Sequence, residues 1–359
     1  KYARKYGRWL NKHLLNCLNN KGEKNMTNSN IEFKKYTLED IGRKPKCFDN
    51  DRDGHGKLAL VDMYGFLFPD GLDEKPIWFI RHCNPDSVRF GGFHRPGDGY
   101  LSVQTPLHLN DIAQKDTPVT GYNRINEKCY GISAKEPFFE YKFYEDHLTY
   151  KETDILDLKA KLFPYAIFKH ADDTIITSQI TQSCIYDGYY EGKKVKGIGN
   201  FELVYVPENE NRKLNDFFSY IYAYDVGIRE DGRKEISMIH LSLSGKSCGF
   251  YWLEGEEPII SNDVEMEANW VRLPYVDDGT CIYKDATWRF GGKEIHFTGK
   301  WGAKGLTSYP RIELHGQSQV LGAWYEGSKP YKHKISMTFH ENMDVYFDKL
   351  KDAGFTVLD

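Results

Sequence analysis

The feature that most constrains the fold is a long series of short segments rich in aromatic and β-branched residues, separated by Gly, Pro, Asp and Asn. Examples are KPIWFIRHC and FELVYV in the first half and KEISMIHLSLSG and KEIHFTGKW in the second. Short segments with turn residues about every 8–12 positions are typical of antiparallel strands in β-sandwiches and barrels. The sequence therefore predicts a mostly β protein without alternating strands and helices.

The length of the chain favours two domains. At 359 residues it exceeds the size at which a single hydrophobic core usually stops growing. The polar run PENENRKLND separates two strand-rich halves, so we predict β domains over residues 57–206 and 217–342. Residues 26–56 read as a linker and lead-in segment. Residues 343–359 space their apolar side chains as a helix does, which predicts a C-terminal helix.

The first 25 residues have a different character. Tyr2, Tyr6, Trp9 and Leu10 begin a series of apolar residues at helical spacing, and Lys and Arg fill the positions between them. This pattern predicts a basic amphipathic helix over residues 1–25. Two interpretations remain open: the helix packs on the folded body with its lysines in solvent, or it makes peripheral contact with an anionic membrane surface.

Composition excludes several classes of function. The formal net charge of -4 gives no general attraction to nucleic acid. Seven cysteines lie far apart with no CxxC pair, so neither a zinc site nor a disulfide framework is indicated and a reducing, cytoplasmic location is expected. The sequence has no phosphate-binding loop, no GxSxG and no HExxH motif. No apolar run reaches the length of a membrane-spanning helix.

One stretch resembles the start of a calcium loop. Asp49, Asp51 and Asp53 alternate before Gly54, as the first ligands of such a loop do. However, Leu60 stands at the twelfth position, where a bidentate Glu is needed, and no preceding helix is evident. We therefore assign no metal ligands here, and calcium binding by the three aspartates stays an open alternative.

Glu202 is a carboxylate in an otherwise apolar strand. In the run IGNFELVY, the period of two places Ile198, Asn200, Glu202 and Val204 on one face and Phe201 on the other. Glu202 then points either to water or into a polar pocket. Beside an apolar pocket, burial would raise its pKa and keep it protonated near neutral pH. The alternative is an ion pair with a neighbouring Lys or Arg.

Two glycine-containing motifs carry a resemblance to a known group. They are GKKVKGIGNFE at residues 192–202 and QVLGAWYEG at residues 319–327, which share Val-x-Gly followed by aromatic residues and a Glu. This pattern resembles the tandem lipocalin-like (calycin) proteins, which include carotenoid 1,2-hydratases, kievitone hydratase and AttH-type proteins, or an uncharacterised bacterial relative of them. In the hydratases a His usually follows the Glu, whereas Leu203 follows Glu202 here.

The resemblance implies two lipocalin-like antiparallel β-barrels in tandem, with pockets for long apolar molecules. It also implies chemistry without a cofactor. The expected function is binding of a hydrophobic small molecule, such as a terpenoid, carotenoid or polyketide, and its hydration, isomerisation or cyclisation by acid/base proton transfer. Two alternatives are a non-catalytic lipid or pigment carrier and a structural interaction module that has no cavity.

The candidate site residues follow from residue type and position. The candidates for proton transfer are Glu202, His82 and His240, and those for substrate binding are Trp78, Arg89, His94, Tyr220, Tyr222, Trp252 and Trp324. The densest polar stretch, residues 80–100, contributes His82, Arg89 and His94, and its arginines suit an anionic head group. The competing interpretations are a solvated turn network for that stretch, a core histidine for His240 and packing of a sheet face for the alternating tyrosines.

Overall fold

The structure, a computed structural model, describes most of the predicted β regions. The described residues are 31–38, 56–69, 71, 76–83, 87–94, 102–103, 117–118, 123–135, 138–169, 178–207, 220–243, 247–272, 279–298, 307–308, 318–321, 323–326, 329–330, 333–343 and 345–358. The predicted N-terminal helix, the calcium-like aspartates and residues 208–216 of the polar run lie outside them.

The first half of the chain forms one large sheet, which we call sheet A. It has 13 strands, and its main hydrogen-bonded order is β6-β4-β3-β2-β14-β13-β11-β10-β9-β8-β7, with β12 joining β13 to β1. The strands are β1 (Ile31–Lys34), β2 (Gly56–Phe68), β3 (Ile77–Cys83), β4 (Ser87–His94), β6 (Thr117–Pro118), β7 (Asn123–Asn126), β8 (Cys129–Lys135), β9 (Phe138–Phe143), β10 (His147–Glu152), β11 (Leu156–Leu162), β12 (Ala166–Lys169), β13 (Ser178–Tyr190) and β14 (Lys193–Pro207).

The second half forms two smaller sheets. Sheet B has eight strands, namely β5 (Ser102–Val103), β15 (Tyr220–Arg229), β16 (Lys234–Ser242), β17 (Ser247–Leu253), β18 (Ile259–Ser261), β22 (Thr307–Ser308), β23 (Ser318–Leu321) and β26 (His333–Met343). Sheet C has six, namely β19 (Glu265–Arg272), β20 (Cys281–Phe290), β21 (Lys293–Thr298), β24 (Ala323–Glu326), β25 (Lys329–Pro330) and β27 (Val357–Leu358). One strand from the first half, β5, pairs with β22 of sheet B.

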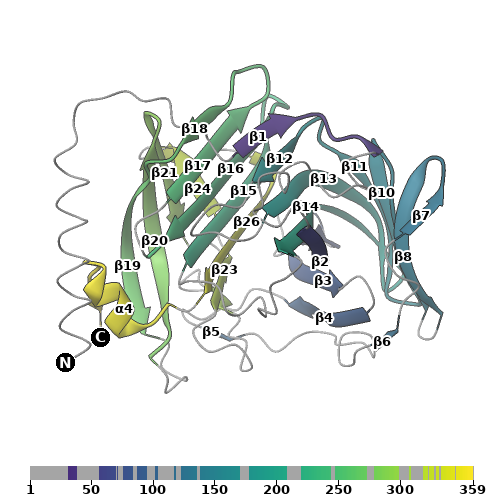
Figure 1. Cartoon of the computed structure of the whole chain (residues 1–359), viewed down its shortest axis with the longest axis horizontal. Helices are drawn as coiled ribbons and strands as arrows, with labels where there is room; N and C mark the ends of the chain where they lie inside the picture. The colour runs from purple at the N-terminus through teal and green to yellow at the C-terminus, as the bar shows by residue number, and fades with distance from the viewer. Residues whose placement is uncertain are drawn as a thin grey trace.

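The three sheets form successive layers with sheet B in the middle (Figure 1). Tyr222, Tyr224 and Phe250 of sheet B pack against apolar residues of sheet A. Ile221 and Tyr251, at alternate positions of the same strands, pack against sheet C instead. The period of two thus gives sheet B two buried faces, and most positions of β15, β16 and β17 are buried.

The closed tandem barrels that the resemblance implies are not found among the described strands. Sheet A curls strongly, but its path ends at β6 and β7, which do not pair with each other. With only two residues, β6 offers few backbone groups that could close a barrel. The second half packs sheet B against sheet C instead of closing a single sheet. The coarser prediction of a mostly β, antiparallel protein is confirmed.

Large side chains fill the concave side of sheet A. Phe79, Phe139, Tyr141 and Phe201 all belong to its buried core. A buried ion pair also crosses this interior. Nη2 of Arg81 in β3 lies 2.8 Å from Oε2 of Glu152 in β10, although four strands separate β3 from β10 along the sheet. The described interior of sheet A is therefore a packed core.

The glycines of the first motif have a packing role. Gly199 of β14 lies opposite Gly65 of β2, and the ring of Tyr186 covers both. A Cβ at Gly199 would lie 2.7 Å from the Cα of Gly65 and 2.9 Å from Cε2 of Tyr186, and would also contact the carbonyl oxygen of Tyr64. The motif leaves room for an aromatic ring against the backbone.

This close approach predicts a cost for adding one methyl group. Gly199→Ala forces Tyr186 or strand β2 to move, so we expect a loss of about 1–3 kcal/mol in the free energy of unfolding. Urea unfolding followed by tryptophan fluorescence measures this loss. Thr149→Ala, on the outer face of β10, is the control that should change little. Equal stability of the Gly199 variant and the wild type would contradict this packing.

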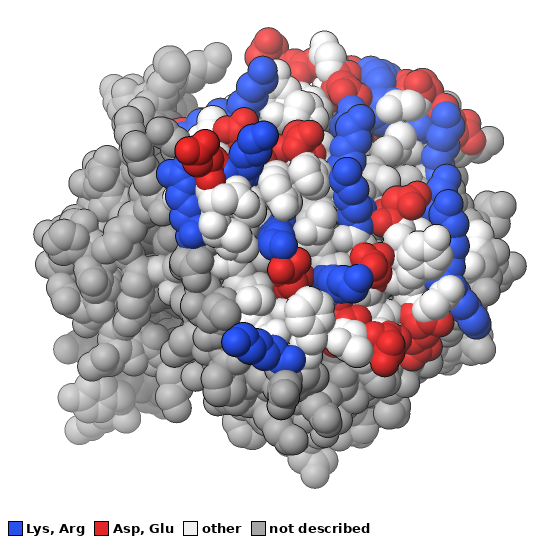
Figure 2. All heavy atoms as spheres, turned by 90° about the vertical axis from the view of Figure 1, so that its right-hand side faces the viewer, with Lys and Arg blue, Asp and Glu red and all other residues white. Residues whose placement is uncertain are grey.

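The outer face of the curled sheet is exposed and carries charges of both signs. Along β11 the buried residues Leu158 and Ala160 alternate with exposed Asp157, Lys159 and Lys161. Figure 2 shows acidic and basic side chains interspersed over this face. Lys142 and Glu140, 2.7 Å apart, form one of its ion pairs.

The C-terminal helix is shorter than predicted. Helix α4 spans Phe347–Asp352, because Met343 still belongs to β26 and Val357 and Leu358 form β27. Leu350 is its buried residue. Among the described residues, no helix has the length and apolar character needed to cross a membrane.

Candidate active site

Glu202 lies at the interface between sheets A and B. Strand alternation turns it, with Ile198 and Asn200, toward sheet B, while Phe201 and Leu203 enter the core of sheet A. Its Oε1 accepts hydrogen bonds from the hydroxyls of Tyr64 at 2.6 Å, Tyr222 at 2.8 Å and Thr181 at 3.1 Å. Tyr222 comes from β15 of sheet B, so both halves of the chain contribute to the site.

The environment of Glu202 changes its acidity. Burial raises its pKa from the ordinary value of 4.5 to about 7, and the nearby Asp62 adds to the rise. The hydroxyl donors Tyr64, Tyr222 and Thr181 act in the opposite direction, because they stabilise the carboxylate. Among the described residues, no Lys or Arg pairs with Glu202, so the ion pair considered from the sequence is not seen there. Both protonation states are populated near neutral pH.

A chain of hydrogen bonds continues from Glu202 along the interface. Asn200 donates from Nδ2 to the Tyr64 hydroxyl at 3.3 Å and accepts at Oδ1 from the Ser183 hydroxyl at 2.8 Å. The hydroxyls of Ser183 and Tyr224 are 3.0 Å apart. This network fixes the orientation of Tyr64, and Tyr64 in turn positions the Glu202 carboxyl group.

Two more ionisable residues align with Glu202 across neighbouring strands. Glu202 of β14 is the register partner of Asp62 in β2, and Asp62 is the partner of His82 in β3. Asp62 is buried. Along β3, position 82 alternates in step with Trp78 and Ile80, whose side chains face the interface. The side chain of His82 lies outside the described part of the structure.

A buried lysine and histidine lie in the same interface. Lys169 of β12 and His240 of β16 bring Nζ and Nδ1 to 2.9 Å. Burial, with Lys169 as the second cause, lowers the pKa of His240 well below its ordinary value. Lys169 is also the register partner of Gln179, whose amide donates to Oε2 of Glu202 at 3.2 Å. The pair thus belongs to the polar region around Glu202.

This polar region is not sealed from solvent. Asp62, Lys169, Glu202, Tyr222 and His240 retain 3–7% of their surface. Gln179 and Tyr220 are half-buried. Apolar residues of the interface such as Phe68, Ile80 and Trp252 keep a similar fraction of their surface.

Aromatic rings form the apolar part of the interface. Trp78 stacks on Phe339 with ring centroids 5.1 Å apart and planes 12° apart. Trp252 packs against Phe33 at 5.0 Å and against Tyr165 at 6.0 Å. A polar region bordered by aromatic walls has the composition typical of small-molecule sites.

The interface brings together six of the ten residues chosen from the sequence. They are Glu202, His240, Trp78, Tyr220, Tyr222 and Trp252. Arg89 and His94 lie in β4 and His82 in β3, but their side chains are outside the described part of the structure. Trp324 lies in β24 of sheet C, on the other side of sheet B, so its strand is not part of this site.

Sequence reasoning missed Tyr64, Asp62, Thr181, Gln179 and Lys169. A signal existed for two of them. Asp62 and Tyr64 are polar residues at alternate positions of an apolar strand, the same pattern that identified Glu202. Lys169, Gln179 and Thr181 carry no such signal, because their role depends on pairing between β12, β13 and β14.

The hydroxyl donors predict how the acidity of Glu202 responds to mutation. Tyr222→Phe removes a donor that stabilises the carboxylate, so we expect the pKa of Glu202 to rise by about 1 unit or more. Infrared spectroscopy of the carboxyl group over a range of pH measures the shift. Tyr189→Phe, at an exposed position, is the matched control. An unchanged titration would show that the Tyr222 hydroxyl does not bind the carboxylate.

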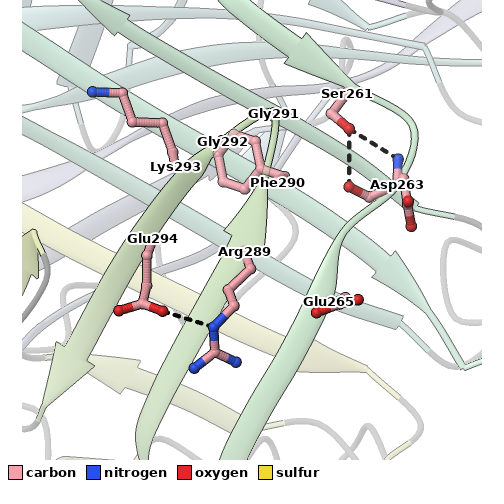
Figure 3. Close-up of a pocket in the computed structure, with 9 residues that line it drawn as sticks. All are labelled: Ser261, Asp263, Glu265, Arg289, Phe290, Gly291, Gly292, Lys293 and Glu294. Atoms are coloured by element: carbon pink, nitrogen blue, oxygen red, sulfur yellow. Dashed lines mark hydrogen bonds and ion pairs between the residues drawn. The ribbon is translucent and has the colours of Figure 1, made fainter.

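Two surface hollows lie outside this interface. One, of about 370 Å³, lies against the β20–β21 hairpin of sheet C (Figure 3). Its lining is mostly charged: Arg289 binds Glu294 at 2.7 Å, and Phe290 is its single aromatic residue. The other, of about 500 Å³, is lined by residues that include Lys35, Tyr36 and His147. Neither includes Glu202.

Within the described ranges, no three His, Cys, Asp or Glu side chains group closely enough to hold a metal ion. The five described cysteines are free thiols, and all are buried.

Comparison with known proteins identifies no family. No protein family matches the sequence, and no curated protein matches it. Three solved structures are similar in fold at 10% sequence identity. An AttH-like protein from Nitrosomonas europaea has a TM-score of 0.42, and the match covers 81% of this chain and 93% of that protein. Kievitone hydratase from Nectria haematococca has a TM-score of 0.43, with 88% and 97% covered. CghA has a TM-score of 0.47, with 88% and 98% covered. At these scores the similarity does not place the chain in the group that its motifs resemble.

Proposed function

We propose that the chain binds a hydrophobic small molecule at the interface of sheets A and B and transfers a proton to or from one of its carbon atoms through Glu202. The reaction is a hydration, isomerisation or cyclisation that needs no cofactor. The observation that carries this proposal is a buried carboxyl group with a pKa of about 7, hydrogen-bonded to Tyr64, Tyr222 and Thr181 beside an aromatic wall.

The geometry supports proton transfer in either direction. A group that transfers protons works best when its pKa lies near the working pH, because both of its forms are then available. The protonated Glu202 gives its proton to carbon, and the carboxylate left behind keeps the hydrogen bonds from Tyr64 and Tyr222. The carboxylate can equally take a proton from carbon. A positive charge that develops on the substrate would be stabilised by the faces of the aromatic rings.

The proposal is tested by following deuterium. We expect the protein, incubated in deuterium oxide with lipophilic extract from its own host, to put deuterium on a carbon atom of one component, which mass spectrometry detects. Proton transfer to carbon leaves this label whether the product is hydrated, isomerised or cyclised. Glu202→Gln should lower the initial rate of labelling by about 100-fold or more, since general acid/base catalysis contributes at least that much.

The control is Glu230→Gln, which alters an exposed carboxylate and should label at the wild-type rate. Labelling by Glu202→Gln at the wild-type rate would assign the chemistry to another group. If the wild type retains a lipophilic molecule through native mass spectrometry but labels nothing in the extract, the protein is a carrier, the main alternative. A carrier has no need of a carboxyl group with a perturbed pKa, which is why we favour the enzyme.

A further inference from the structure

The hydrogen bond between Lys169 and His240 determines which nitrogen of the imidazole carries a proton. A lysine ammonium group can only donate, so Nδ1 of His240, 2.9 Å from Nζ of Lys169, must accept. The imidazole is then neutral, and its proton is on Nε2. The low pKa of His240 agrees with this tautomer. His240 therefore presents an N–H donor at Nε2.

This donor has no hydrogen-bond partner among the described residues, although His240 is only 4% exposed. Buried N–H groups are nearly always paired, so one left without a protein partner is available to a ligand. Lys169 places a positive charge on the opposite side of the ring, which makes the Nε2 proton a stronger donor.

His240 is close to the proton-transfer group. Its ring lies 6.0 Å from the ring of Tyr222, whose hydroxyl binds Glu202, and 4.7 Å from the ring of Tyr220. His240 and Glu202 thus contact the same tyrosine, Tyr222. The site would combine a hydrogen-bond donor with a group that moves a proton.

We propose that His240, supported by Lys169, binds a carbonyl oxygen of the substrate, and that Glu202 moves a proton at a carbon atom conjugated with that carbonyl group. The substrate class is thus an apolar unsaturated ketone, ester or amide. This inference rests on the proposed function and narrows it.

The chemistry balances without any further reactant. The Glu202 carboxylate takes a proton from the carbon next to the carbonyl group, the C–H bond breaks, and its electron pair moves through the new C=C bond onto the carbonyl oxygen. His240 Nε2–H and the charge of Lys169 stabilise the enolate. The carboxyl proton of Glu202 exchanges with water, and Glu202 then gives a proton to another carbon of the conjugated system, which completes an isomerisation. A carboxyl group with a pKa of about 7 is a weak acid for an isolated alkene, but its strength suits enolisation assisted by a donor at the oxygen.

The test compares 2-naphthol with naphthalene as probes. Both are flat and apolar, and the oxygen of ionised 2-naphthol resembles an enolate. Fluorescence titration of the wild-type protein should show 2-naphthol binding about tenfold or more tightly than naphthalene, as expected for a hydrogen bond to charge. The absorption spectrum should show that bound 2-naphthol ionises at a lower pH than it does in water. His240→Phe and Lys169→Met should each remove most of the preference.

His296→Phe is the matched control, because His296 lies in sheet C, and it should keep the preference. If naphthalene binds and 2-naphthol binds no better, the inference that His240 binds a carbonyl oxygen is wrong. The apolar binding site of the proposed function then still stands. Loss of the preference in Glu202→Gln but not in His240→Phe would also overturn the inference, because the oxygen would then bind at Glu202. If neither probe binds, the proposed function itself fails. Should the His240 variant not fold, the ionisation of 2-naphthol on the wild type decides the question.

Discussion

Glu202→Gln is expected to be more stable than the wild type above pH 7 and to lose that advantage in acid. The glutamine resembles the protonated carboxylic acid in shape and remains neutral at every pH. The folded wild type, in contrast, must hold a buried carboxylate once the pH exceeds the raised pKa of about 7. The variant avoids the free-energy cost of burying a carboxylate.

The sign and size of this stability difference follow from the pKa values of Glu202 in the unfolded and folded states. Unfolded, the carboxyl group loses its proton near pH 4.5, and folded it keeps the proton until about pH 7. Between these values the folded state holds one more proton than the unfolded state, so its stability falls as pH rises. The fall amounts to on the order of 3 kcal/mol at 1.36 kcal/mol for each unit of pKa. Below this pH range the stability that comes from the raised pKa of Glu202 is fully present, and above it none remains.

Urea unfolding of both proteins at about pH 4.5 and about pH 8 measures the effect. The difference in unfolding free energy between variant and wild type should grow by on the order of 3 kcal/mol from the lower to the higher pH. Glu230→Gln, at an exposed position, should have the same unfolding free energy as the wild type at both pH values. A difference that does not depend on pH would mean that Glu202 titrates as an ordinary carboxyl group, and the candidate site would lose its main support.

The face on which Glu202 lies could be predicted because strand alternation is a local property. Ile198, Asn200 and Glu202 share the face that meets sheet B, as the period of two requires. The same alternation along β16 puts His240 on the face of Ile236 and Met238, which meets sheet A. Each of these predictions needs only a few consecutive residues.

The partners of Glu202 could not be predicted, because they are distant in sequence. Tyr64 is 138 positions away, and Lys169 and His240 are separated by 71. Such contacts depend on how β14 pairs with β2 and how sheet B is laid on sheet A. The pattern of residues within a single segment predicts neither the strand pairing nor the sheet packing. Both are set by packing across the whole fold.

The closed barrels are the finer part of the fold prediction, and the described strands do not confirm them. A series of short strands is compatible with both barrels and layered sheets, and the family resemblance favoured barrels. Strand β15 carried a signal for layers, because Tyr222 and Tyr224 on one face and Ile221 and Ala223 on the other are apolar, whereas a barrel strand with one face in solvent alternates.

Arg81→Met should cause the largest loss of stability among the changes considered. Arg81 and Glu152 are both at most 3% exposed, and Oε2 of Glu152 accepts from Nε of Arg81 at 2.9 Å and from the Tyr150 hydroxyl at 3.0 Å. Removing the guanidinium group leaves a carboxylate buried in the core of sheet A without its positive partner. We expect a loss of about 3–5 kcal/mol in the free energy of unfolding.

A double variant shows whether the loss comes from the unpaired charge. Arg81→Met with Glu152→Met fills the same space with apolar side chains and should recover most of the stability, because replacing a buried pair by hydrophobic residues is often neutral. Arg233→Met, which breaks an exposed pair with Asp231, should have little effect. Recovery in the double variant would show that the interior of sheet A is an ordinary packed core. A double variant no more stable than Arg81→Met would instead mean that the ion pair is required to hold β3 and β10 together, so that the curl of sheet A depends on it.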